Sequence, residues 1–167
     1  SFSLPPYNHF IINFFTFILF FIYLFRINKN INSKIIYFKY GWFFGFGYFI
    51  SNLYWLSISL TFDENYKFLI PFSIILVPAF MALFYGVAIY MFSYFLNNKK
   101  VISSVLIFSL IFGLVELIRG YILSGFPWNL ISYSFSEEIY FLQILSLIGT
   151  YSFNIICITL FTIPSIF

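Results

Sequence analysis

The sequence predicts an all-α fold, a polytopic bundle of about five transmembrane helices. Of its 167 residues, 62% are hydrophobic and 8% are charged, whereas an ordinary soluble domain contains about 25% charged residues. Apolar runs of about twenty residues recur along the chain, and a helix of that length crosses the hydrocarbon core of a bilayer. We therefore expect one transmembrane domain over residues 1–167 and no soluble domain.

Five charge-poor segments underlie this prediction, namely residues 7–25, 40–62, 68–96, 101–123 and 139–163. At about 1.5 Å per residue, a helix of about 23 residues reaches about 34 Å, enough to cross with some tilt. The third segment is longer than a crossing requires. Within it, Pro71 is expected near the helix start and Pro78 is expected to kink the helix, or else the segment folds as a helical hairpin.

Basic residues in the loops predict the orientation of the bundle, because positively charged loops stay on the cytoplasmic side. Only Lys67 and Arg119 fall at one predicted end. Six basic residues fall at the other end, between the first and second segments and between the third and fourth: Arg26, Lys29, Lys34, Lys39, Lys99 and Lys100. We therefore expect the N-terminus outside and the C-terminus inside.

The residue types present exclude several kinds of site. Cys157 is the only cysteine, so an internal disulfide and a cysteine-based metal site are impossible. The only histidine is His9, which has no carboxylate near it in sequence, and we predict no metal and no cofactor. No basic face for nucleic acid is present. The chain begins with Ser and ends in apolar residues, and we expect it to be a piece of a longer protein.

The fourth segment contains an acid and a base, Glu116 and Arg119. They are three residues apart, so they share a helix face and can pair. Ionisable residues inside a membrane span are costly and are functional candidates by default. One interpretation is a polar anchor for a lipid head group, or a brace for the loop that follows. The other is a structural salt bridge with Arg119 snorkelling to the interface.

A turn that carries two large aromatic residues follows this helix, in the stretch Gly125-Phe126-Pro127-Trp128. Gly supplies a positive φ and Pro prevents the helix from continuing. Phe126 and Trp128 are thereby expected at the membrane surface. They either line an entry groove for acyl chains or belong to the ordinary interfacial belt of aromatic residues.

A GxxxG pair, Gly41 and Gly45, lies in the second segment. Small residues at this spacing let two helices approach closely, so we predict a packing role for both glycines.

Several blocks of the chain resemble, in order, the membrane part of the apolipoprotein N-acyltransferase family. The most specific is Glu116-Leu-Ile-Arg119-Gly120 followed by Gly125-Phe-Pro-Trp128 and then Tyr133. Residues 2–7, 45–59 and 142–153 carry the rest of the resemblance, which covers nearly the whole chain.

The resemblance implies a bacterial enzyme of the inner (plasma) membrane. Such an enzyme moves an acyl chain from a phospholipid donor to the N-terminal diacylglyceryl-cysteine of an apolipoprotein acceptor, through a thioester intermediate. In the family, a Glu-Lys-Cys triad in a nitrilase-like domain performs the chemistry, and nothing in residues 1–167 resembles that domain. We therefore expect no catalytic residue in this chain, no nucleophilic role for Cys157, and no activity of this piece alone.

The resemblance also implies roles for the candidate residues: Trp128 lies near bound lipid, Phe126 is the next candidate, and Glu116 and Arg119 brace the loop. Two other function classes stay open at this point. Part of a transporter or lipid flippase would show polar residues at mid-membrane and broken helices in paired halves. A non-catalytic membrane scaffold would dimerise through its small-residue faces. Neither explains the block from Glu116 to Trp128.

Overall fold

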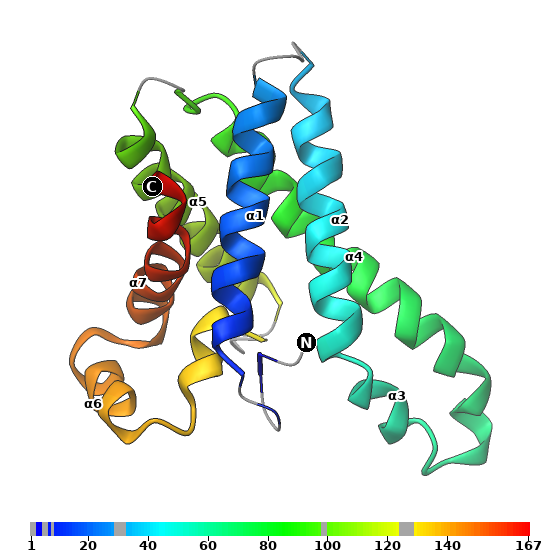
Figure 1. Cartoon of the computed structure of the whole chain (residues 1–167). Coiled ribbons are helices and arrows are strands. Elements are labelled where there is room, and N and C mark those ends of the chain that lie inside the picture. The colour runs from blue at the N-terminus through cyan, green and yellow to red at the C-terminus, as the bar shows by residue number, and fades with distance from the viewer. Residues whose placement is uncertain (1–2, 5–6, 8, 29–32, 98–99, 124–128) are drawn as a thin grey trace.

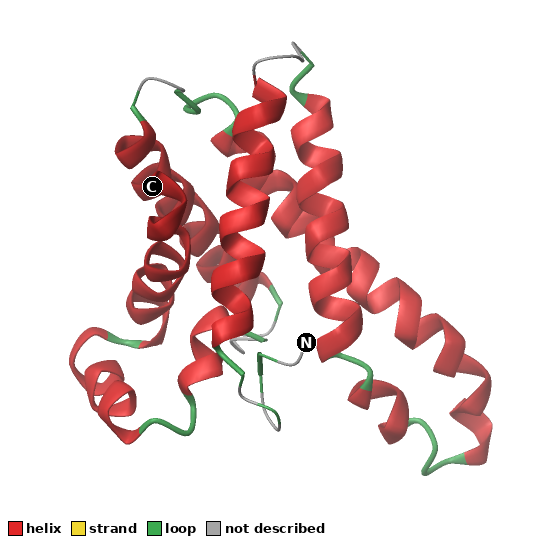
Figure 2. Ribbon diagram, in the orientation of Figure 1, coloured by secondary structure: helices red, strands yellow, loops and turns green. Residues whose placement is uncertain are grey.

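The computed structural model describes residues 1–167 apart from residues 1–2, 5–6, 8, 29–32, 98–99 and 124–128 (Figure 1). The described residues form helices, turns and loops and no strand (Figure 2), which confirms the predicted all-α class. The α-helices are α1 (Ile11–Asn28), α2 (Ile35–Asn52), α3 (Trp55–Ser59), α4 (Ile70–Phe92), α5 (Val101–Ile122), α6 (Ile139–Ile148) and α7 (Thr150–Thr162). Short 3-10 helices are η1 (Glu64–Leu69), η2 (Ile131–Phe135) and η3 (Ile163–Ile166).

Two of the described helices are long and apolar enough to cross a membrane. One is the stretch Glu64–Phe92, which joins η1 to α4, and the other is α5; an 18-residue window within each has a mean hydropathy of 2.3 and 2.5, respectively. Apolar helices that are shorter cover Ile11–Ile27, Ile139–Ile148 and Thr150–Ile166.

The helix limits differ from the predicted segments where local backbone chemistry intervenes. Residues 40–62 do not form one helix. Instead, α2 begins earlier and ends at Asn52, and the separate short α3 follows it. Residues 139–163 divide into α6 and α7 at Gly149, whose φ of 79° interrupts the helix. Pro71 lies in the first turn of α4, as predicted. Pro78 lies inside α4, which continues to Phe92 as one helix, so this segment does not fold as a helical hairpin, and the kink at Pro78 stays a prediction.

The GxxxG pair packs α2 against α4. A Cβ added to Gly41 would lie 2.6 Å from the Tyr85 carbonyl oxygen, and one added to Gly45 would lie 2.8 Å from the Tyr85 Cβ. The backbones of α2 and α4 are therefore so close that neither Gly41 nor Gly45 has room for a side chain, and the predicted packing role is confirmed.

Aromatic rings fill the space between α1 and its neighbours. Phe17 on α1 meets Phe44 on α2 edge-on, with ring centroids 5.6 Å apart, and meets Phe112 on α5 at 6.1 Å. Phe20 stacks on Phe44 at 4.1 Å. Contacts between aromatic rings stabilise particular orientations of the rings beyond the burial of apolar area. They bring α1 and α2 together around Phe44.

The connections gather at the two ends of the bundle (Figure 1). The α1–α2 and α4–α5 connections lie at one end, at the top of the figure, and Lys34 and Lys100 belong to them. The helices α3 and α6 lie toward the opposite end, which we call the site end.

Candidate functional site

Glu116 and Arg119 lie inside the bundle, enclosed by protein. Their side chains are 0% and 1% exposed, and Arg119 Nη2 is 3.8 Å from Glu116 Oε1. Arg119 therefore does not snorkel to the surface, which corrects that part of the structural interpretation. The salt bridge itself is present, as the spacing predicted.

The Glu116 carboxylate is held by hydrogen bonds from two other helices. The Tyr85 hydroxyl on α4 donates to Oε1 at 2.7 Å, and the Asn154 amide on α7 donates to Oε2. The Arg119 guanidinium also lies 5.0 Å from the Phe49 ring centroid, a cation–π distance. A buried ion pair is tolerated when further hydrogen bonds and contacts satisfy it in this way. We call Tyr85, Glu116, Arg119 and Asn154 the polar cluster.

The polar cluster is connected to the segment 129–136 at the site end. Asn154 Oδ1 accepts a hydrogen bond from the Ser132 backbone N–H at 3.0 Å. The Tyr48 hydroxyl donates to the Asn129 carbonyl at 3.0 Å, and the Tyr48 ring stacks on that of Tyr85 with centroids 5.9 Å apart. Asn129 has a φ of 44°, in the left-handed region that Asn tolerates better than most residues. The segment is thus fixed at both its first residue and its 3-10 turn.

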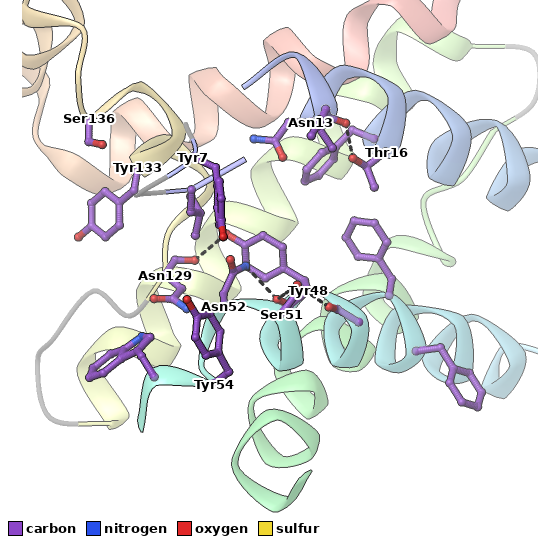
Figure 3. A pocket seen from close by; sticks show the side chains of 17 residues that line it. Tyr7, Asn13, Thr16, Tyr48, Ser51, Asn52, Tyr54, Asn129, Tyr133 and Ser136 are labelled. Carbon is purple, nitrogen blue, oxygen red and sulfur yellow. Dashed lines mark hydrogen bonds between the residues drawn. The ribbon is translucent and has the colours of Figure 1, made fainter. Parts of the chain in front are cut away.

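A cavity of about 1140 Å³ lies between α1, α2 and this segment (Figure 3). Figure 3 shows Asn13 and Thr16 of α1 facing Tyr48, Ser51 and Asn52 of α2 across it. Phe17 and Phe44, whose rings are in contact, belong to its wall. The lining is Leu4, Tyr7, Ile12, Asn13, Thr16, Phe17, Phe43, Phe44, Gly47, Tyr48, Ser51, Asn52, Tyr54, Trp55, Asn129, Tyr133 and Ser136. We call this space the α1–α2 cavity.

The lining of the α1–α2 cavity is aromatic, amide and hydroxyl, and none of its described residues is charged. Burial raises the pKa of the Tyr133 phenol, Tyr151 and Glu116 raise it further, and Arg119 lowers it. The side-chain amide nitrogens of Asn13 and Asn129 are buried and meet no hydrogen-bond acceptor in the described part of the chain. Such a cavity suits an uncharged, partly apolar ligand with acceptor atoms.

Phe126 and Trp128, predicted to contact lipid, lie outside the described residues. The next residue, Asn129, is on the cavity wall.

The sequence interpretation missed most of the partners that make this site. Tyr85 and Asn154 are 31 and 38 residues from Glu116 in sequence, so no local spacing connects them. The available signal was their polarity, because an Asn in an apolar span often forms hydrogen bonds between helices. The same signal applied to Asn13 on α1.

The two candidates for chemistry in this chain are a metal site built from His, Cys, Asp and Glu side chains and the thiol of Cys157. The described residues form no group of three or more His, Cys, Asp and Glu side chains that could hold a metal ion. Cys157 is 1% exposed within α7 and does not line the α1–α2 cavity, so it packs as a small buried residue.

Comparison with known families assigns the chain. The family profile described as "Apolipoprotein N-acyltransferase N-terminal domain" matches residues 1–162. This chain belongs to the apolipoprotein N-acyltransferase family. The resemblance read from the sequence is confirmed.

Curated members of the apolipoprotein N-acyltransferase family are similar over most of this chain. The protein of that name from Rickettsia prowazekii is 39% identical over 125 residues, which are 74% of this chain and 25% of the relative. Those from Brucella melitensis and Rhizobium etli are 33% and 34% identical, over 77% and 78% of this chain and 24% of each relative. The chain thus spans about a quarter of the length of these relatives. No solved structure matches it.

Proposed function

We propose that this chain is the membrane part of an enzyme that moves an acyl chain from a phospholipid to the N-terminal diacylglyceryl-cysteine of a lipoprotein. The observation that carries the proposal is the match of residues 1–162 to the N-terminal domain of the family. Its partners are then the phospholipid donor, the apolipoprotein acceptor and the surrounding membrane lipids. Its location is the bacterial inner membrane, which it crosses several times.

The proposed role of this part is to hold lipid, while the reacting groups lie in other residues of the enzyme. The α1–α2 cavity offers an uncharged aromatic and amide lining of about 1140 Å³. Cys157 is buried in α7 away from that lining, so it is not placed to attack an acyl ester. The relatives are about three times as long as this chain, which leaves ample length for the nitrilase-like domain that the family resemblance implies.

We infer that Glu116 and Arg119 brace the wall of the cavity. Glu116 accepts a hydrogen bond from Asn154, and Asn154 in turn accepts one from the Ser132 backbone. The Glu116 carboxylate is 0% exposed and Glu116 is not among the residues that line the α1–α2 cavity, so the geometry favours the bracing role. Trp128 directly precedes Asn129 in sequence and Phe126 lies three residues before it, and contact with lipid is the role we propose for both.

The orientation that we propose places the site end outside the cytoplasm. Basic residues are concentrated in the two connections at the other end of the bundle and in the helix ends beside them, and such positively charged regions stay cytoplasmic. The cavity then opens on the side where lipoproteins receive their final acyl chain.

A chimeric enzyme tests the proposed function. Residues 1–162 replace the corresponding part of the Rickettsia prowazekii relative, and the chimera is produced in bacteria depleted of their own N-acyltransferase. Mass spectrometry of a lipoprotein's N-terminal peptide measures whether a third acyl chain is added. We expect triacylated lipoprotein.

Two controls make this experiment decisive. The unaltered relative shows that the assay reports acyl transfer, and a chimera lacking the membrane part shows the background. Diacylated lipoprotein alone, at a membrane level of chimera equal to that of the relative, would contradict the proposed function.

A further inference from the structure

Asn13 lines the α1–α2 cavity and carries a buried hydrogen-bond donor, Nδ2, for which the described residues supply no acceptor. The residue is 4% exposed, and its Nδ2 meets no acceptor among the described residues. It lines the cavity (Figure 3). A buried N–H group without an acceptor is unfavourable, so such a group points to a ligand or ordered water that supplies one.

Asn13 borders a cavity whose chemistry restricts the ligand. No described lining residue is charged, so a phosphate or carboxylate would meet no counter-charge there. Asn129 Nδ2, on the opposite wall, is a second buried donor without an acceptor in the described structure. The remaining lining is largely aromatic and aliphatic. A ligand that matches both features carries neutral carbonyl oxygens next to an alkyl chain.

Room for the chain is provided at Gly47. A Cβ added to this residue of α2 would meet no atom within 4 Å, whereas at Gly41 and Gly45 it would collide with α4. Gly47 lines the cavity less than one helical turn from Phe44, which meets Phe17 and Phe20. The absence of a side chain here therefore keeps space open rather than allowing helices to pack.

We propose that Asn13 recognises the ester carbonyl of an acylglycerol, with its Nδ2–H donating to the carbonyl oxygen and the acyl chain passing Gly47. The substrate class rests on the proposed function, because both the donor and the acceptor of that reaction are glycerol esters. The recognised group is the ester itself and not the head group. Phospholipid and diacylglyceryl-peptide are thus bound through the same element.

Paired ester and ether lipids test this assignment on the whole 167-residue chain, purified in a maltoside detergent, which contains no ester. Native mass spectrometry measures the Kd of monopalmitin and of chimyl alcohol, which carries an ether in place of the ester. We expect the ester to bind about fivefold more tightly, as one hydrogen bond provides. In Asn13→Leu this preference should fall to about equal binding. A merely damaged fold would weaken both lipids equally and leave their ratio unchanged.

Two further measurements keep the proposal open to refutation. Gly47→Leu should weaken the binding of both lipids by about tenfold, and it should not destabilise α2, because Leu is a better helix former than Gly. The control, Leu114→Phe, at a position of α5 that is 43% exposed, should change the binding of neither lipid. Palmitoyl lysophosphatidylglycerol should bind no more tightly than monopalmitin. An ester preference that survives in Asn13→Leu, unchanged binding by Gly47→Leu, or a strong preference for the phosphate lipid would each overturn the proposal.

The two proposals fail separately. A chimera without acyl transfer would contradict the proposed function while the ester preference of the chain stood. Loss of the ester assignment would leave the family function untouched.

Discussion

Glu116 is a buried charge whose partners come from three helices. Arg119 lies on its own helix, Tyr85 on α4 and Asn154 on α7. A buried ion pair contributes little net stability by itself, but removing one partner leaves the other charge unpaired at a large cost. The cluster therefore acts mainly to specify one arrangement of these helices.

Replacement of Glu116 by Ala should destabilise the chain by about 3–5 kcal/mol, since the Arg119 charge would stay buried without its carboxylate. Glu64→Ala is a matched control, because Glu64 also pairs with a basic residue three positions later, Lys67, but is 86% exposed. That change should cost no more than about 1 kcal/mol. Thermal unfolding in detergent measures both, and equal losses would refute the role given to burial.

At the scale of residues, the sequence identified one half of the cluster. The spacing of Glu116 and Arg119 on one helix face was sufficient to predict their pairing, and the pairing is observed. Asn154 and Tyr85 were beyond prediction, because their contacts depend on how α7 and α4 pack on α5. The cavity donor Asn13 was also missed, as only the fold brings it opposite α2.

At the scale of elements, α2 and α4 pack so closely that no side chain fits at Gly41 or Gly45. Gly45→Ala places a methyl group 2.8 Å from Tyr85 Cβ and 3.1 Å from the Ala82 Cα. Overpacking of this kind costs about 1–3 kcal/mol. Gly47→Ala should be neutral or stabilising by about 0.5–1 kcal/mol, because its methyl group meets open space and Ala favours helix. Chemical unfolding of both variants checks the difference, and a tolerated Gly45→Ala would contradict the observed packing.

The contact between α7 and η2 gives a second prediction. Asn154→Leu removes the acceptor of the Ser132 N–H and the donor to Glu116. Amide hydrogen exchange in residues 131–135 should become about fivefold faster, corresponding to one lost hydrogen bond. Gln143→Leu on the exposed surface of α6 is the matched amide control. Unaltered exchange in Asn154→Leu would show that the polar cluster does not fix this segment.

The observed helix limits agree with the predicted segments where the apolar run is uninterrupted. They differ from the predicted segments where the backbone conformation ends a helix within an apolar run. The fourth predicted segment, 101–123, is α5 almost to the residue. Nothing in the hydrophobic pattern of 139–163 distinguishes Gly149 from a glycine inside a helix, yet its positive φ separates α6 from α7. Likewise α2 ends at Asn52 although apolar residues continue to Phe62. Hydropathy reports burial in lipid or protein and does not report the backbone conformation that ends a helix.

At the scale of the whole molecule, the proposed orientation predicts which end of the bundle is accessible from outside. A cysteine reporter in place of Glu137, exposed next to η2, should react with a membrane-impermeant maleimide in spheroplasts. A reporter in place of Lys100, exposed at the other end, should react only after lysis. The natural Cys157 is buried and should contribute no background. The reverse pattern would contradict the orientation.

The most direct test of a lipid-holding membrane part is acyl transfer by the chimeric enzyme when the α1–α2 cavity is filled. Gly47→Leu adds a side chain to open space inside the cavity, and Leu114→Phe adds bulk on the exposed face of α5. With equal amounts of each chimera in the membrane, we predict that Gly47→Leu lowers the rate of lipoprotein triacylation by about tenfold, which corresponds to about 1.4 kcal/mol, while Leu114→Phe leaves it unchanged. Full activity of the Gly47→Leu chimera would contradict the assignment of this cavity to lipid.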